Sequence, residues 1–227
     1  MADGEGASPL ARMQVLAVQD VPVKPGMRHL EVYTMRGLLT VLWHGPADAE
    51  AAVVACGGAM GGLLGPADGL YHWLGDELGE RGIATLRVSY RKPNDLDACV
   101  EDAGAAAEMA YAEGVKRFVL MGHSFGGAVA VSCGAFLRSL CAGVVTLATQ
   151  SAGCEMAIAI ADKELLFVHG GRDRILPVMA SEVVQQIAGG GGDLVVYPDA
   201  DHLLSECKDE LRALVLPWLE RVLTAQN

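Results

Sequence analysis

Short apolar runs alternate with helical stretches along most of this chain, and no other feature restricts its fold so strongly. Several of these runs are apolar at every position, which is typical of strands in a parallel sheet covered on both faces. Because strand-then-helix order favours right-handed crossovers, we predict an α/β fold with a doubly wound, mostly parallel sheet of about eight strands. The expected parallel-sheet strands are 38–43, 51–56, 84–88, 118–121, 144–148, 165–169 and 194–197.

Helices are expected between these strands, while the start of the chain follows a different pattern. Residues 13–18 and 30–35 alternate like antiparallel edge strands, and an exposed edge there would permit a homodimer without requiring one. We predict a disordered or poorly ordered tail over 1–12 and a single domain over 13–227. The expected helices are 70–80, 96–112, 125–137, 178–188 and 203–223, the last interrupted by Pro217.

Composition and charge narrow the class of protein further. The chain is 52% apolar, enough for a buried core, so disorder along its whole length is excluded. It has 17 Lys and Arg residues and 28 Asp and Glu residues, which gives a net charge of −11. A phosphate backbone or an anionic membrane surface would repel such a protein on average, so nucleic acid is not expected as a partner.

One uncharged stretch, 118–137, has about the length of a membrane span. Glycines interrupt it, so a strand, a glycine-rich turn and a buried helix explain it better, and no membrane span is expected. Six cysteines show neither paired nor zinc-ligand spacing, which indicates free thiols and no metal site. The first ten residues lack the pattern of a secretory signal, so we expect a cytoplasmic protein.

The segment with the strongest chemical indication follows the expected strand 118–121. It reads Gly-His-Ser-Phe-Gly-Gly over 122–127 and leads into a helix. This G-x-S-x-G pattern would arise by chance in roughly 0.1 copies, but its place between strand and helix is typical of a nucleophile elbow. Such a turn exposes its serine beside a helix N-terminus, where backbone N–H groups favour developing negative charge. Ser124 is therefore the candidate nucleophile.

A serine hydroxyl attacks an acyl carbon only with a base and an orienting carboxylate. The expected strand 165–169 leads to Asp173, and the strand 194–197 leads to His202. The order Ser124, Asp173, His202 is the order of this kind of triad, with each residue just past the carboxyl end of a strand. We predict that His202 is the base and that Asp173 orients it.

Acyl transfer also requires backbone N–H groups directed at the oxyanion. One is expected from Phe125, directly after the nucleophile. The other is expected from the glycine-rich segment 57–62, with Ala59 as the first choice and Gly58 or Met60 as alternatives in register. A dinucleotide-binding loop is the competing interpretation of this segment, but its glycines do not match G-x-G-x-x-G.

These segments together resemble the α/β-hydrolase superfamily, over about residues 28–224. The motifs at 57–62, 122–127, 169–173 and 201–202 carry the likeness, with the G-I-A-T-L-R-V-S-Y-R segment at 82–91. The resemblance is closest to small esterases and to the dienelactone-hydrolase-like and serine-aminopeptidase-like branches. It implies the same site roles: nucleophile Ser124, base His202, orienting acid Asp173, and oxyanion donors Ala59 and Phe125. It implies no cofactor.

Two departures from these relatives are visible. Many carry His-Gly before the oxyanion donor, where this chain has Gly57 and Gly58. Dienelactone hydrolases use a cysteine nucleophile, so Ser124 does not imply their particular activity. Only residues 149–164 separate the expected strands 144–148 and 165–169, so no cap domain is expected between them. A site without a cap is open to water, which favours hydrolysis over transfer of the acyl group to another acceptor.

The expected function is therefore hydrolysis of small carboxylic esters through an acyl-enzyme. A non-catalytic binding protein with the same fold is the alternative, because fold does not fix function. Within enzymes, a thioesterase or peptidase also stays open, since a triad accepts any acyl group that the pocket admits.

Overall fold

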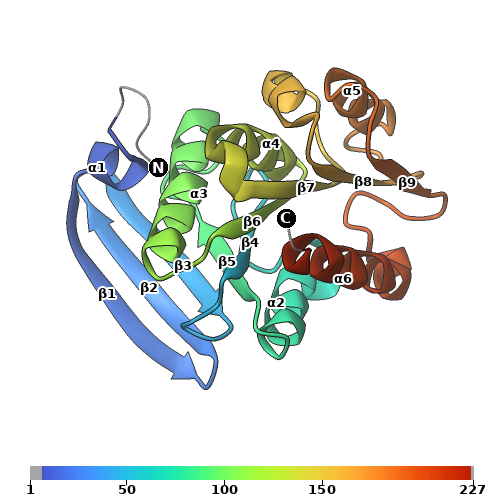
Figure 1. Ribbon diagram of the computed structural model, residues 1–227. Helices are drawn as coiled ribbons and strands as arrows, with labels where there is room; N and C mark the ends of the chain where they lie inside the picture. The colour runs from blue at the N-terminus through green and yellow to red at the C-terminus, as the bar shows by residue number, and fades with distance from the viewer. Residues whose placement is uncertain (1–6, 226–227) are drawn as a thin grey trace.

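The computed structural model describes residues 7–225. Nine strands form one sheet in the order β1-β2-β3-β5-β4-β6-β7-β8-β9, antiparallel from β1 to β5 and parallel from there to β9 (Figure 1). The predicted doubly wound, mostly parallel α/β class is confirmed. The strands are β1 (Val15–Lys24), β2 (Met27–Thr34), β3 (Gly37–His44), β4 (Ala51–Cys56), β5 (Ala84–Ser89), β6 (Arg117–His123), β7 (Cys141–Leu147), β8 (Glu164–Gly170) and β9 (Asp193–Tyr197).

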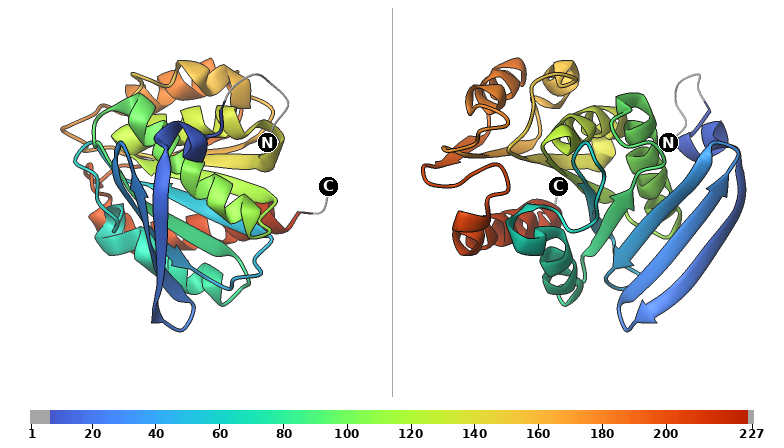
Figure 2. Two further views of the ribbon diagram at one scale, coloured as in Figure 1. Left: turned by 90° about the vertical axis from the view of Figure 1, so that its left-hand side faces the viewer. Right: turned by 180° about the vertical axis from the view of Figure 1, so that it is seen from behind.

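Helices cover both faces of the central sheet (Figures 1 and 2). One layer contains α1 (Pro9–Met13), α3 (Leu96–Ala112), α4 (Phe125–Leu137) and α5 (Met179–Ile187). The other contains α2 (Pro66–Gly79) and α6 (Lys208–Thr224), which contact each other. Three short 3-10 turns complete the structure: η1 (Arg138–Leu140), η2 (Glu155–Ile160) and η3 (Ser205–Cys207).

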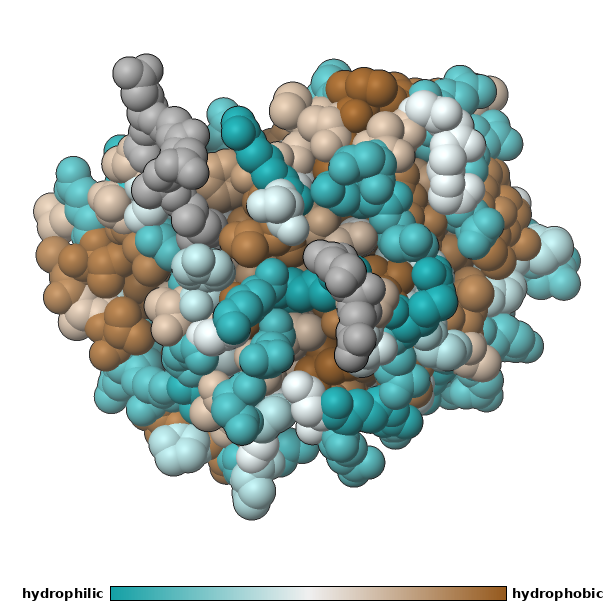
Figure 3. Space-filling model, in the orientation of Figure 1, coloured by the Kyte–Doolittle hydropathy of each residue, from teal (hydrophilic) through white to brown (hydrophobic). Residues whose placement is uncertain are grey.

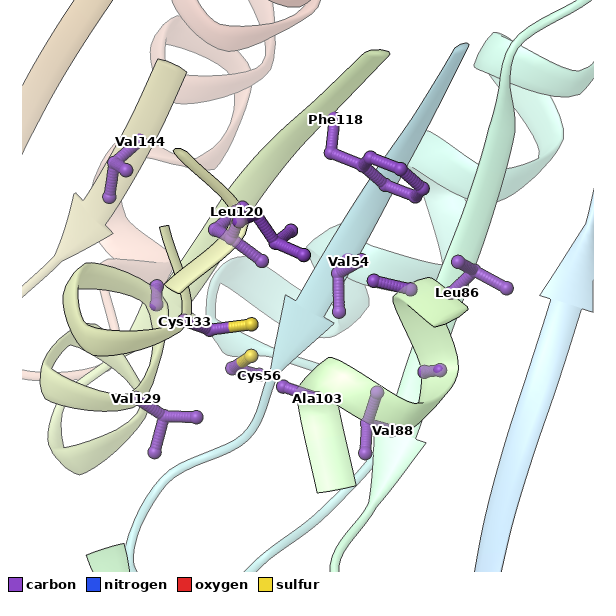
Figure 4. Close-up of a cluster of buried hydrophobic side chains, with 14 of the residues drawn as sticks. Val54, Cys56, Leu86, Val88, Ala103, Phe118, Leu120, Val129, Cys133 and Val144 are labelled. Carbon is purple, nitrogen blue, oxygen red and sulfur yellow. The ribbon is translucent and has the colours of Figure 1, made fainter. Parts of the chain in front are cut away.

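The core is divided by the sheet into two apolar clusters. Along β4, Val54 packs towards α3 and α4, whereas the adjacent Val53 belongs to the cluster under α2 and α6 (Figure 4). Both side chains are fully buried, and each such burial contributes roughly 1.5–3 kcal/mol to stability. This is why the central strands are apolar at successive positions.

The first part of the chain differs from the sequence expectation. Residues 1–6 of the predicted tail lie outside the described residues, but the tail does not extend to residue 12, because Ser8 caps the helix α1. The strand expected over 13–18 runs instead over Val15–Lys24. It forms the sheet edge, where little burial constrains its pattern, and apolar side chains including Leu16 and Val18 gather on that surface (Figure 3).

The last helix also differs from its prediction. It begins at Lys208 instead of residue 203, because the preceding residues form the loop and the turn η3 that follow His202. It then continues through Pro217, which does not interrupt it. No helix among residues 7–225 is long and apolar enough to cross a membrane. The connection from β7 to β8 holds only the short turn η2, so the described chain has no cap domain, as expected.

Candidate active site

The turn between β6 and α4 holds Ser124 in an unusual backbone conformation. Its φ of 57° and ψ of −122° lie in a region that non-glycine residues rarely adopt, at a cost of roughly 1–3 kcal/mol. Two hydrogen bonds fix the turn: Ser124 N–H donates to the Leu147 carbonyl at 2.9 Å, and Gly127 N–H donates to the Ser124 carbonyl at 2.9 Å. The predicted strand–turn–helix context of the motif is confirmed.

The glycines of the motif are required by close approaches of the backbone. A Cβ on Gly122 would collide with the backbone of Gly126, and a Cβ on Gly126 would collide with the carbonyl oxygens of Cys56 and Gly57. The elbow is therefore packed directly on the carboxyl end of β4. No side chain larger than hydrogen fits there without moving the backbone.

Asp173 and His202 come together from the loops after β8 and β9. His202 Nδ1 lies 2.7 Å from Asp173 Oδ2, and the Asp173 side chain is completely buried. The other carboxylate oxygen, Oδ1, accepts from the N–H groups of Ile175 and Leu176 at 2.8 and 2.9 Å. Burial by itself would raise the pKa of Asp173, but these two N–H groups and the His202 ring together hold it below its ordinary value.

The loop that carries His202 lies directly beside the elbow. His123, the residue before Ser124, donates through Nε2 to the His202 carbonyl at 2.9 Å, and the two imidazole rings are 4.8 Å apart. Within residues 7–225, Ser124 Oγ makes no hydrogen bond to His202. The structure thus joins the predicted acid and base, and the His123 contact brings the His202 loop to the elbow, without a closed Ser–His contact. In unliganded enzymes such catalytic hydrogen bonds are often long.

Two histidines near the site have roles that sequence reasoning did not assign. His123 is buried, which lowers its pKa to about 4 and keeps the ring neutral as a donor to the His202 loop. His169, at the end of β8, places Nε2 3.2 Å from Asp173 Oδ2 and Nδ1 2.7 Å from Ser181 Oγ. Their positions, His123 directly before Ser124 and His169 at the start of the segment 169–173, were the only sequence signal, since a buried histidine at a strand end has no distinctive spacing.

The glycine-rich segment after β4 forms a tight turn at the same edge of the sheet. Gly61 N–H donates to the Gly58 carbonyl at 2.9 Å, so Ala59 and Met60 occupy the tip. A Cβ on Gly58 would lie 3.9 Å from Ser124 Cβ, which places this turn against the elbow. Neither Ala59 N–H nor Phe125 N–H has an acceptor among the described residues. The two predicted oxyanion donors therefore stay candidates.

One group of metal-ligating side chains occurs among the described residues, away from the triad. His44, His72 and Asp76 place ligand atoms within 4.8 Å of one another. Lys24 Nζ, however, already pairs with Asp76 at 3.0 Å, and burial lowers the pKa of His44 to about 4. We interpret this group as a polar network between β3 and α2.

Comparison with known proteins supports the fold. No family model and no curated protein matches the sequence. Among solved structures, a serine hydrolase homologue from Coxiella burnetii is 19% identical, with a TM-score of 0.69 over 84% of this chain and 96% of that one. A dienelactone hydrolase from Anabaena variabilis is 17% identical, with a TM-score of 0.69 over 91% and 99%. A serine hydrolase without a lid from Xanthomonas campestris is 20% identical, with a TM-score of 0.67 over 91% and 98%.

Proposed function

Since the chain has the α/β-hydrolase fold, we propose that it is a serine hydrolase that cleaves small carboxylic esters through an acyl-enzyme on Ser124. The observation that carries the proposal is the Asp173–His202 pair, 2.7 Å apart, with the His202 loop in contact with the strained elbow of Ser124 through His123. A buried carboxylate bonded to His Nδ1 leaves Nε2 free to accept a proton, which is what a weakly acidic serine requires.

The first half of the reaction forms the acyl-enzyme. Ser124 Oγ attacks the ester carbonyl carbon while His202 Nε2 takes the hydroxyl proton, and the N–H groups of Ala59 and Phe125 stabilise the oxyanion. Collapse of the tetrahedral intermediate breaks the bond to the alcohol oxygen, which receives the proton from His202. In the second half, His202 takes a proton from water, and the resulting attack releases the carboxylic acid and restores Ser124.

The open edge of the sheet favours small esters and hydrolysis. Between β7 and β8 the described chain has only the turn η2, so no cap encloses a long acyl chain or excludes water. The neighbour from Xanthomonas campestris is likewise described as lacking a lid. A thioesterase or a peptidase would use the same residues, and a cytoplasmic location stays a prediction from the sequence.

The proposal is tested with a fluorophosphonate probe, which reacts only with an activated serine. Intact mass should show one adduct on the wild-type protein and none on Ser124→Ala. Ser132→Ala is the matched control, because Ser132 lies on α4 outside the elbow and its hydroxyl donates to the Gly153 carbonyl. No adduct on folded wild-type protein would overturn the proposal and favour a binding protein on the hydrolase fold. A panel of 4-nitrophenyl esters, thioesters and amides then separates the three activities.

A further inference from the structure

His169, near the carboxyl end of β8, is completely buried between the loop that carries the predicted acid and the helix α5. Its Nδ1 lies 2.7 Å from Ser181 Oγ on α5. Its Nε2 lies 3.1 Å from the Leu176 carbonyl oxygen and 3.2 Å from Asp173 Oδ2. The Ser181 side chain is completely buried as well. Both ring nitrogens therefore have polar partners inside the protein.

These partners determine which ring nitrogen carries the proton. A carbonyl oxygen can only accept, so Nε2 of His169 donates to Leu176. With one proton on the ring, Nδ1 is an acceptor, and the hydroxyl of Ser181 can rotate to donate to it. The positive end of the Nε2–H dipole then lies beside the carboxylate oxygen Oδ2 of Asp173.

Leu176 connects the ring of His169 to the other carboxylate oxygen. Its carbonyl accepts from His169, and its N–H donates to Asp173 Oδ1 at 2.9 Å. The same loop residue is thus bound on one side by the ring and on the other side by the acid. Oδ2 of Asp173 meanwhile lies 2.7 Å from His202 Nδ1. Removal of the His169 ring would release the Leu176 carbonyl, and the carboxylate would lose part of what fixes its orientation towards His202.

We propose that His169 is a positioning residue of the triad. Held by Ser181, it binds the Leu176 carbonyl and keeps the Asp173 carboxylate in the orientation that the base His202 needs. It acts through Asp173 and not on the substrate. Such orientation matters because a displacement of about 1 Å in an active site can lower the rate by up to about 100-fold. The inference rests on the proposed function for its effect on turnover, but the contact between acid and base can be measured without turnover.

Two substitutions separate the two sides of the His169 ring. The side chain of His169→Asn can still accept from Ser181, but it is too short to reach the Leu176 carbonyl. The side chain of His169→Gln is longer, and its amide nitrogen can still donate to Leu176. In hydrolysis of 4-nitrophenyl acetate we expect His169→Asn to lower kcat by roughly 10- to 100-fold with KM nearly unchanged. His169→Gln should retain most of the wild-type kcat.

Proton NMR gives a readout that requires no turnover. The Nδ1 proton of His202, bonded to a carboxylate oxygen at 2.7 Å, should exchange slowly with water and resonate far downfield. We expect this resonance in the wild type and in His169→Gln, and its loss in His169→Asn. Ser181→Ala is the milder variant if His169→Asn fails to fold. It should broaden the same resonance and lower kcat by a smaller factor.

His44→Asn is the matched control. His44 is also a buried histidine at a strand end, with Nδ1 3.2 Å from an oxygen of Asp76, but it lies on β3 and outside the triad. Its substitution should change neither kcat nor the resonance, and thermal melting verifies that each variant folds.

Three results would overturn the inference. They are absence of the resonance from the wild type, equal losses in His169→Asn and His169→Gln, and wild-type resonance and kcat in folded His169→Asn or Ser181→Ala. Failure of the proposed function gives a different result, namely no fluorophosphonate adduct on wild-type protein, and the NMR comparison then still tests the positioning role.

Discussion

Replacement of Asp173 by asparagine is the sharpest test of how the acid controls the base. Asp173 Oδ1 accepts from two backbone N–H groups, those of Ile175 and Leu176, so the amide oxygen of an asparagine would be held there. Its NH₂ group would then face His202 Nδ1, now 2.7 Å from Oδ2. Because that nitrogen would have to accept, the proton of the ring moves to Nε2, which can no longer take the proton of Ser124.

The expected loss follows from this change of tautomer. In a serine triad the corresponding substitution lowers kcat by about 10⁴-fold. The same NH₂ would also face His169 Nε2, which lies 3.2 Å from Oδ2 and carries a proton, because it donates to the Leu176 carbonyl. The NH₂ group and the His169 N–H would then be two donors in contact without an acceptor between them. We expect this to destabilise the fold by about 1–3 kcal/mol. Steady-state hydrolysis of 4-nitrophenyl acetate measures the first effect and urea unfolding the second.

Asp199→Asn provides the control for this substitution. Asp199 lies on the same loop as His202, but it is exposed and, among the described residues, pairs only with Arg172 at 2.6 Å. It should retain wild-type activity and stability. A folded Asp173→Asn protein with activity within tenfold of wild type would refute the reasoning.

Two further predictions concern stability. Gly126→Ala should unfold the elbow region, because its Cβ would collide with the Cys56 and Gly57 carbonyls, and we expect urea unfolding to show a loss of about 3 kcal/mol or more in stability. Gly191→Ala, where a Cβ meets nothing within 4 Å, should leave stability nearly unchanged. Similar urea midpoints for the two variants would contradict the packing argument. Acidification should also destabilise the protein, because burial lowers the pKa of His123 from 6.5 to about 4. As the pH falls, this histidine is protonated in the unfolded chain before it is protonated in the folded one. The free energy of unfolding therefore drops by up to about 3 kcal/mol between pH 6.5 and pH 4. Thermal melting across this range should show a steeper slope for wild type than for His123→Gln, and identical slopes would disprove the assignment.

The fold was predictable where burial constrains the sequence and unpredictable where it does not. Strands β4 to β8 are buried on both faces, so their apolar runs identified them directly. The edge strand β1 is almost wholly exposed, so burial does not constrain which of its residues are apolar, and its continuation to Lys24 was not predicted. At the start of α2, Ala67 and Asp68 adopt positive φ values of 51° and 54°, which their residue types do not indicate.

The candidate site was predictable to a similar extent. Ser124, Asp173 and His202 could be proposed as its residues because each follows a strand in a characteristic order. The supporting contacts of His123 and His169 could not, since they depend on how two loops fold over the sheet edge. The register of the oxyanion donor depends on backbone geometry alone, and backbone N–H groups carry no sequence signature.

The glycine pair that departs from the His-Gly of many hydrolases has a physical explanation in the structure. A Cβ on Gly57 would collide with the Gly62 carbonyl, so the tight turn from Gly58 to Gly61 excludes any side chain at that position. Two buried tyrosines anchor the loop at its base: Tyr71 donates to the Cys56 carbonyl at 2.9 Å, and Tyr90 donates to the Gly57 carbonyl at 3.2 Å. These bonds fix the peptide groups Cys56–Gly57 and Gly57–Gly58, which precede the one that carries the Ala59 N–H. The loop is thus held from behind by α2 and the end of β5, and the rigidity that an oxyanion donor needs does not require the missing histidine.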